Sequence, residues 1–322
     1  MNRTPVTIEV ESPVPGETDR RSVDEYVYLL GRPPLKQFLD FVEEQVVDGR
    51  SLERRALIEE WTSANNVIRL LEENEAGWAD NPKIGAIGPH LEHLRNEFLK
   101  DPLLEHSFRS VPIEVGIVEL DRLVVYQKHI NLEFVRAAKK KLGDAPGDED
   151  VFKTCLPSDR ATPAAKLIRS RNDTYQFVSP SNDLRFLGPM ILQSDHITGQ
   201  PHPGVLVGVI GLAVGFGTNL LNVIHAENRL VLNNGSHRAF TLRQLGITHV
   251  PCLIQHASSR EELTLVGSAE LKLNPDRYLL HPRPPMFKDY FDPRLRKVFP
   301  VTRQLRQVRV NFNIEENYLP AV

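Results

Sequence analysis

The sequence predicts an α+β protein, in which a helical N-terminal region precedes a mixed sheet domain and a proline-rich C-terminal extension. Three observations support this fold class. Apolar residues recur at helical spacing before residue 110, apolar runs bounded by turn residues follow it, and prolines crowd the tail. At 322 residues the chain has room for two domains. The expected divisions are 1–22, 23–110, 111–274 and 275–322.

The composition is that of a soluble globular protein, with 25% charged and 41% hydrophobic residues. A formal net charge of −3 argues against a generic nucleic-acid-binding surface, so nucleic acid is not the expected partner. Cys155 and Cys252 are too few for a disulfide framework and fit no metal-binding spacing. The N-terminus lacks the charged and apolar parts of a secretory signal. We therefore expect a cytoplasmic protein.

Residues 1–110 show helical patterns without evident chemistry. Residues 1–22 combine prolines and charges with little apolar periodicity, and we predict a flexible arm there. We assign the rest of this region to packing or to homo-oligomerisation. Its third helix should be capped by Ser51 and should end at Gly77. The predicted helices cover 22–30, 34–49, 51–77 and 89–101.

Residues 111–274 carry the apolar strands. A strand is predicted at 112–120, a helix at 132–142, a short basic helix at 163–171 and a strand at 175–178. Residues 204–224 carry no charge over about twenty residues, near the length that spans a bilayer. Glycines interrupt this stretch, so we predict one or two fully buried strands with a tight bend and no membrane segment.

The tail after residue 274 is too rich in proline to form a long helix. We predict that it covers the core with apolar side chains and that residues 307–314, where apolar and polar residues alternate, form a strand with one buried face. The covering side chains are Met286, Phe287, Tyr290 and Phe291.

The stretch 229–254 predicts a strand, a tight loop, a short helix, a glycine stop and a second strand. Gly235 can supply a positive φ, Ser236 is a good N-cap, and Gly246 fits the position after the helix. His237 and Arg238 place cations in the first turn, where each opposes the helix dipole by roughly 0.3–1 kcal/mol. An anion bound to the exposed N–H groups would remove this conflict, so the loop predicts a phosphate site.

This stretch resembles the ParB/sulfiredoxin family. In that family a strand leads into a Gly-x-(His or Arg)-Arg loop at a helix N-terminus, and the loop binds nucleotide phosphates. The segment Gly235-Ser236-His237-Arg238 fits that pattern, and the strand at 112–120 with its following helix fits the same scheme. The resemblance implies a ParB/sulfiredoxin-like, nucleotide-binding mixed sheet domain over 111–274. Residues 1–110 and 275–322 lie outside it.

The resemblance also implies a role for each residue of the loop. Gly235, with Asn234 beside it, would let a phosphate approach the backbone, and Ser236 would donate hydrogen bonds to it. Arg238 would give charge-assisted contacts, and His237 would be a second donor or an acid–base group near neutral pH. The implied cofactor is ATP or another nucleotide, with Mg²⁺ as a candidate companion. No residue is assigned as a metal ligand.

Branches of the family differ at this loop. Sulfiredoxins have their catalytic cysteine where this chain has Ser236, and a hydroxyl cannot replace a thiolate in that reaction. Partition proteins continue into a helix-turn-helix segment, whereas this chain continues into its proline-rich tail. ATP- or ADP-dependent kinases that act on free serine keep a His-Arg pair in the loop. That branch stays open for this chain.

Phosphoryl transfer would need carboxylates for the metal and for the acceptor hydroxyl. The candidates are Glu119 and Asp121 at the end of the first strand and Glu227 just before the loop, although charges at strand ends are usually solvated. The leading hypothesis is a nucleotide-binding protein that acts as an ATP-dependent phosphotransferase on a small molecule or a protein. The alternatives are a non-catalytic module that senses a nucleotide or anion, and a ParB-like nuclease or DNA-binding protein.

Overall fold

The computed structural model describes residues 7–9, 22–158, 162–170, 174–193 and 204–320. It is a mixed α+β structure with 37% helix, 28% strand and four small sheets, which confirms the α+β part of the prediction. The chain forms two compact units, each built from separate segments. Unit 1 comprises residues 1–20, 160–219 and 304–322, and unit 2 comprises residues 21–159 and 220–303.

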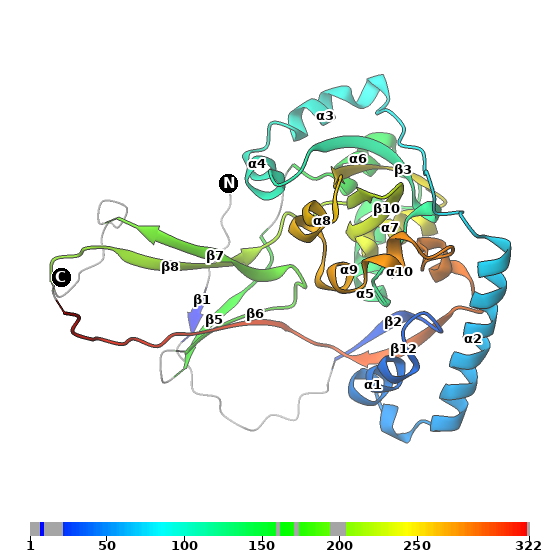
Figure 1. The fold of residues 1–322 in the computed structure, drawn as a ribbon, viewed down its shortest axis with the longest axis horizontal. Helices are drawn as coiled ribbons and strands as arrows, with labels where there is room; N and C mark the ends of the chain where they lie inside the picture. The colour runs from blue at the N-terminus through cyan, green and yellow to red at the C-terminus, as the bar shows by residue number, and fades with distance from the viewer. Residues whose placement is uncertain (1–6, 10–21, 159–161, 171–173, 194–203, 321–322) are drawn as a thin grey trace. The chain divides into compact units, whose positions relative to one another are not determined.

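The main sheet of unit 2 has the strand order β10-β9-β11-β3 (Figure 1). β9 and β11 run parallel, and the other neighbours run antiparallel. The apolar residues of β9 and β10 are buried on both faces, which explains why their sequences run apolar without alternation. The strands are β3 (Ile113–Glu119), β9 (Asn222–Ala226), β10 (Arg229–Asn234) and β11 (His249–His256).

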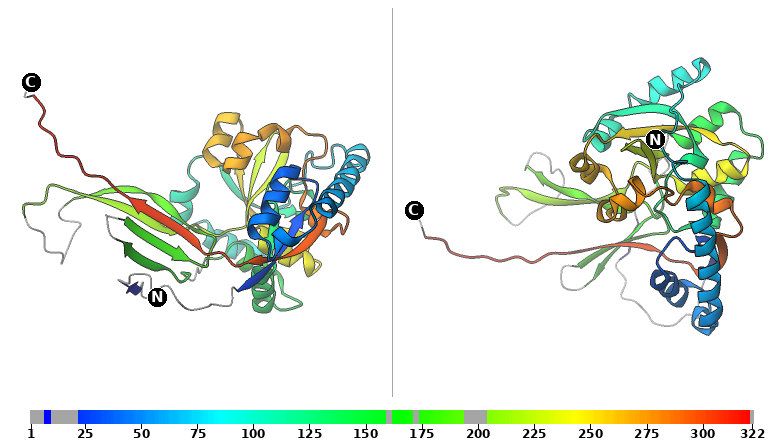
Figure 2. Two further views of the ribbon diagram at one scale, coloured as in Figure 1. Left: turned by 90° about the horizontal axis from the view of Figure 1, so that it is seen from below. Right: turned by 45° about the vertical axis from the view of Figure 1, so that its right-hand side comes forward.

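Helices cover both faces of this sheet, as the two views of Figure 2 also show. Successive side chains of β10 point to opposite faces. Leu230 and Leu232 join the core under α5 (Leu132–Leu142), α6 (Asp148–Cys155) and α7 (Ser236–Gln244). Val231 joins a second core under α8 (Arg260–Val266), α9 (Ala269–Leu273) and α10 (Pro275–Leu279).

A second sheet of unit 2 has the order β12-β2-β4 and packs against two helices. Its aromatic core contains Tyr28, Phe38 and Phe299, with the Tyr28 and Phe38 rings 5.6 Å apart. The elements are β2 (Val23–Leu29), β4 (His129–Asn131), β12 (Arg296–Thr302), α1 (Leu35–Gln45) and α2 (Arg54–Asn74). Shorter connecting elements are η1 (Gly49–Ser51), η2 (Pro89–Leu91), α3 (Glu92–Phe98), α4 (Pro102–Phe108), η3 (Leu120–Arg122) and η5 (Phe287–Phe291).

Several predicted elements of this unit are confirmed with shorter bounds, including the helices over 34–49, 51–77 and 89–101 and the strand over 112–120. The helix predicted over 22–30 is wrong, because those residues form β2 between β12 and β4. Its β-branched and aromatic residues suit a strand that is buried on both faces. Ser51 is not the cap of α2 but lies in η1, and Glu53 holds the cap position.

Unit 1 contains a sheet of order β1-β5-β6-β13 and a two-stranded ribbon, β7–β8. The helix predicted over 163–171 is wrong, because β5 forms there and pairs with β6. The strand predicted over 307–314 is confirmed over 307–311 as part of β13, in which Val308 and Val310 are half-buried. The predicted buried face does not extend to Phe312 and Ile314, which follow β13 and are 43% and 73% exposed. The bounds are β1 (Thr7–Glu9), β5 (Lys166–Ser170), β6 (Thr174–Ser179), β7 (Leu184–Leu192), β8 (Val209–Phe216) and β13 (Arg306–Asn311).

The charge-free stretch 204–224 divides between the two units. The prediction of fully buried strands holds for β9 but is wrong for β8, in which Ile210 is 76% exposed. An uncharged apolar sequence favours a buried strand. Burial also requires another element to pack against the strand, and the sequence of the strand does not show whether one does. Among the described residues, no helix combines the length and the apolar character needed to cross a bilayer. The arm predicted over 1–22 lies outside the described residues, except for β1 and Ser22.

The proline-rich tail enters the core of unit 2. Met286, Phe287 and Tyr290 are fully buried and Phe291 packs against them, which confirms the predicted covering role. The tail also pairs with the segment that follows η3: Val125 N–H donates to Pro285 O at 2.9 Å, and Phe287 N–H donates to Leu123 O at 2.8 Å.

A buried ion cluster holds this tail in place. The Asp289 carboxylate accepts hydrogen bonds from Arg32 at 3.0 Å, from Arg283 at 2.6 Å and from the Met286 N–H at 3.0 Å. Arg283 also donates to Glu75 Oε2, at the end of α2, at 2.9 Å. Asp289 and Arg283 side chains are each 1% exposed, so each charge depends on its partners for solvation.

We expect Asp289→Asn to lower the free energy of unfolding by about 3–5 kcal/mol, because two guanidinium groups would lose their shared buried counter-charge. Urea denaturation measures this. Asp292→Asn is the control, since Asp292 pairs with the exposed Arg294 and should cost no more than about 1 kcal/mol. Equal effects of the two substitutions would contradict the role of the cluster.

The same carboxylate predicts an acid dependence. Burial alone would raise the pKa of Asp289, but Arg32 and Arg283 outweigh it and hold the pKa below its usual value. The stabilisation is therefore present above about pH 4, near the pKa of an unfolded aspartate, and is lost as pH falls through the folded pKa. Asp289→Asn should flatten this part of the stability profile.

Candidate anion-binding site

The loop between β10 and α7 requires glycine. Gly235 has φ +91°, and a Cβ there would lie 2.8 Å from Leu221 Cδ1 and 3.0 Å from Leu221 Cα. The predicted positive φ is confirmed, but the predicted cap is shifted by one residue. Gly235 occupies the N-cap position, and Ser236 is the buried first residue of the helix. Gly246, with φ +82°, follows the helix as predicted.

Hydrogen bonds from neighbouring segments fix the end of β10. Tyr126 Oη donates to Asn233 O at 2.7 Å, and Gln127 Nε2 donates to Leu232 O at 3.1 Å. Asn233 Nδ2 donates to Asn222 Oδ1 at 2.9 Å. Asn234 Oδ1 accepts the N–H of Gly235 at 2.8 Å, so this predicted binding residue helps to hold the loop itself.

The first turn of α7 presents uncompensated backbone donors. The helical ladder begins with Ala239 N–H, which donates to Gly235 O at 2.9 Å. No side chain caps the helix and no acidic residue lies in its first turn. Across the part of the chain that the structure describes, the N–H groups of Ser236 and His237 have no hydrogen-bond acceptor. These donors and the positive end of the helix dipole favour an anion.

His237 does not have the acid–base character predicted for it. Burial, together with the charges of His129 and Arg238, lowers its pKa to about 4. The imidazole is therefore neutral at pH 7 and has no proton to release near that pH. Its ring lies 5.2 Å from that of Phe134, and its buried Nε2 has no hydrogen-bond partner among the described residues.

Arg238 places its charge near the end of α6 as well as in the first turn of α7. Burial raises the pKa of Cys155 to about 12, and Arg238 opposes this shift only in part. Burial likewise raises the pKa of Cys252. Both thiols are fully buried and protonated at neutral pH.

The structure does not bring the predicted carboxylates to the loop. Glu227 lies at the far end of β10, and six residues at about 3.3 Å each separate it from Gly235 by roughly 20 Å. It pairs there with Arg260 at 3.0 Å. Glu119 ends β3, three strands from β10, or roughly 14 Å to the side at about 4.8 Å per strand. The catalytic role of Glu119 and Glu227 stays a prediction, and the strand order places neither carboxylate beside the loop.

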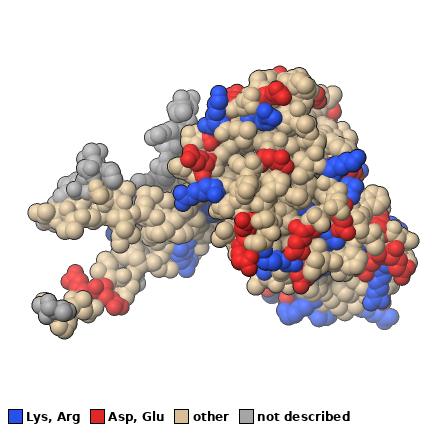
Figure 3. Space-filling model, turned by 45° about the horizontal axis from the view of Figure 1, so that its top comes forward, with Lys and Arg blue, Asp and Glu red and all other residues tan. Residues whose placement is uncertain are grey.

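Asp121 also lies away from the phosphate loop. Its carboxylate receives two hydrogen bonds from Arg243, at 2.8 and 2.9 Å, and Arg243 is in the last turn of α7. Among the described residues, no three His, Cys, Asp or Glu side chains lie close enough to hold a metal ion. On the face seen in Figure 3, basic and acidic side chains alternate over the described surface of unit 2.

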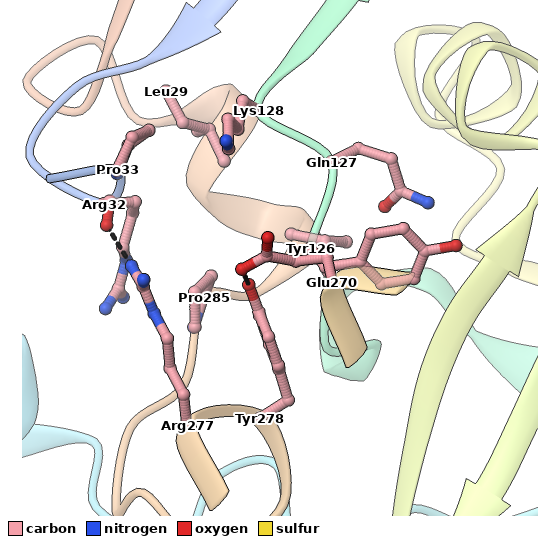
Figure 4. Close-up of a pocket in the computed structure, with 11 residues that line it drawn as sticks. Leu29, Arg32, Pro33, Tyr126, Gln127, Lys128, Glu270, Arg277, Tyr278 and Pro285 are labelled. Atoms are coloured by element: carbon pink, nitrogen blue, oxygen red, sulfur yellow. Dashed lines mark hydrogen bonds between the residues drawn. The ribbon is translucent and has the colours of Figure 1, made fainter. Parts of the chain in front are cut away.

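Tyr126 and Gln127, which hold the end of β10, also line a small cavity of about 20 Å³ (Figure 4). Tyr126 and Gln127 border it, and the Oε1 of Gln127 is buried without a hydrogen-bond partner among the described residues. The volume suits a water molecule and not a nucleotide. The charged side chains of its lining are Arg32, Lys128, Glu270 and Arg277.

Sequence reasoning missed Tyr126, Gln127 and Asn222 as supports of the loop. Tyr126 and Gln127 contact residues that are more than a hundred positions away in the sequence. Asn222 contacts Asn233, which is eleven positions away. No local sequence pattern predicts such contacts. The apolar run that precedes Tyr126 was the available signal, since it marks a segment that must lie against the core.

Gly235→Ala should destabilise the protein by roughly 1–3 kcal/mol, because the methyl group would meet the Leu221 backbone in addition to the strain of a positive φ. Gly246→Ala is the matched control: it has a similar φ of +82°, lies at the other end of α7, and has open space around it. Urea denaturation of both variants separates the steric contribution from the strain. A smaller loss for Gly235→Ala than for Gly246→Ala would contradict the close packing described here.

Comparison with known proteins adds no evidence about this site. No protein-family model, no curated protein and no solved structure matches the chain.

Proposed function

We propose that this protein binds a phosphate-bearing ligand, with a nucleotide as the first candidate, at the turn formed by Gly235 to Arg238. The observation that carries the proposal is the pair of N–H groups on Ser236 and His237, which lack acceptors among the described residues at an uncapped helix N-terminus. Arg238 adds a positive charge to the same turn, and Gly235 leaves the backbone bare of side-chain atoms.

The geometry favours binding without catalysis. Phosphoryl transfer needs a carboxylate near the transferred group, whereas Glu119 and Glu227 lie at remote positions of the sheet. His237 is neutral at pH 7 and so offers no acid. We therefore favour a non-catalytic, nucleotide- or anion-sensing module over an ATP-dependent phosphotransferase. If Mg²⁺ accompanies the nucleotide, the phosphates would supply its ligands at this turn.

A ParB/sulfiredoxin-like architecture remains part of the proposal. The succession of β10, a glycine loop with a His-Arg pair, α7 and the returning strand β11 supports it. Support from the first strand is weaker, because β3 lies at the opposite edge of the sheet from β10.

Calorimetric titration with ATP, ADP, CTP and GTP in the presence of Mg²⁺ tests the proposal. We expect binding of at least one nucleotide, and a loss of about ten- to a hundredfold in affinity for Arg238→Ala, the usual effect of removing a charge-assisted hydrogen bond. Arg243→Ala is the matched control, since it removes an arginine from the other end of the same helix. Absence of binding for all four nucleotides, and for inorganic phosphate, would sink the proposal.

A second measurement follows the protonation of His237. In the free protein its pKa is about 4, and an anion bound at the same turn should raise it by stabilising the imidazolium. Affinity for inorganic phosphate should then increase as pH is lowered from 7 toward the raised pKa. NMR titration of the histidine resonances with and without phosphate detects this, with the exposed His249 as the internal control. An unchanged His237 titration at saturating phosphate would place the anion elsewhere.

A further inference from the structure

Two histidines meet at the carboxyl ends of neighbouring parallel strands in the main sheet of unit 2. His225 lies near the end of β9, His256 is the last residue of β11, and the two are direct partners in the register. Their side chains therefore lie on the same face of the sheet. The two Nδ1 atoms are 3.1 Å apart, and the rings are nearly perpendicular, at 84°. The two imidazoles thus turn the same nitrogen toward each other without overlapping.

A carboxylate on the next strand fixes the proton of one ring. His256 Nε2 lies 2.9 Å from Glu114 Oε1 on β3. Because a carboxylate only accepts, neutral His256 carries its proton on Nε2 and keeps a lone pair on Nδ1. In the free protein His225 then donates its Nδ1 proton to that lone pair. Among the described residues, no hydrogen bond involves His225 Nε2, so this nitrogen is able to take the proton instead.

The pair is suited to bind a metal ion at neutral pH. Burial and the neighbouring His256 lower the pKa of His225, and Glu114 opposes the shift only in part, so the His225 imidazole is neutral at pH 7. Neutral imidazole is the form that binds metal ions. The side chains of His256 and Glu114 are 34% and 48% exposed, so an ion has access from solvent.

The spacing of the two nitrogens is close to that of a zinc site. Zn²⁺ lies about 2.0–2.1 Å from histidine nitrogens in tetrahedral geometry, which places two such nitrogens about 3.3–3.4 Å apart. Side-chain movements of about 0.2–0.3 Å would bring the observed 3.1 Å to this value. A carboxylate that accepts the other ring N–H of a ligating histidine is the usual support for such a ligand, and Glu114 is in that position.

We propose that His225 and His256 bind a divalent transition-metal ion through their Nδ1 atoms, with Zn²⁺ as the first candidate. The ion takes the place of the shared proton, which moves to His225 Nε2, and Glu114 orients the ring of His256. Imidazole ligands select Zn²⁺, Cu²⁺ or Ni²⁺, whereas Mg²⁺ and Ca²⁺ prefer oxygen. Two protein ligands leave the remaining positions to water, so the bound ion stays open to a further ligand.

This site is separate from the proposed anion site. His225 is opposite Leu230 on β10, and five residues at about 3.3 Å each separate Leu230 from Gly235 by roughly 16 Å. Either site is therefore able to exist without the other.

Calorimetric titration of the metal-free full chain, without a histidine tag, with ZnCl₂ at about pH 7 tests the proposal. We expect one Zn²⁺ per chain. His225→Asn and His256→Asn should each weaken binding by about a hundredfold, because asparagine keeps a hydrogen-bonding group near the Nδ1 position but is no imidazole ligand. Glu114→Gln should weaken it by roughly tenfold, as expected for the support of a ligand. His249→Asn, at the other end of β11, is the matched control and should leave binding unchanged.

NMR of the unaltered chain gives a second readout that does not depend on how a variant folds. Zn²⁺ should move the imidazole nitrogen resonances of His225 and His256 to those of metal-bound Nδ1 and protonated Nε2, and it should leave those of His249 in place. Absence of binding of Zn²⁺, Cu²⁺ and Ni²⁺ would overturn the proposal. So would binding that either histidine variant retains at full strength, or binding that shifts neither His225 nor His256.

Discussion

The Asp289 carboxylate, buried between two guanidinium groups, is the contact on which unit 2 depends. Its partner Arg32 is 257 positions away in the chain and follows β2, while Arg283 and Met286 are close neighbours in the tail. Because the charges are buried, each member is stable only in the presence of the others. The cluster therefore secures the tail that carries Phe287 and Tyr290 into the core.

The candidate anion site is connected to this cluster through successive backbone pairings. The tail beside Asp289 pairs with residues 123–125, and Val124 in turn pairs with β10 through bonds to Leu230 and Leu232. Tyr126 and Gln127 continue this segment and hold the end of β10, from which Gly235 turns into α7. A rigid strand end is what a preorganised anion site requires, since a loose turn would have to be ordered by its ligand.

Local signals were sufficient to predict the strand, loop and helix around Gly235, because glycine positions and apolar runs act over a few residues. The sequence of β2 also fits a helix, because a short apolar run is compatible with either structure, and the strand's partner β12 is far away in the sequence. The positions of Glu119 and Glu227 relative to the loop depend on the order of the strands in the sheet. A local sequence pattern does not predict that order. The low pKa of His237 depends on burial beneath distant elements, including the one that carries His129.

The division of both units into separate chain segments has a consequence for folding. Unit 2 is interrupted by residues 160–219, and its sheet β12-β2-β4 joins strands from opposite ends of the unit. During synthesis, β2 can pair with β12 only after nearly the whole chain has left the ribosome, because β12 lies close to the C-terminal end. Such long-range pairing makes folding slow, since the loop-closure entropy is lost before the contacts form. The exposed apolar β2 would then need protection by chaperones until the last strands arrive.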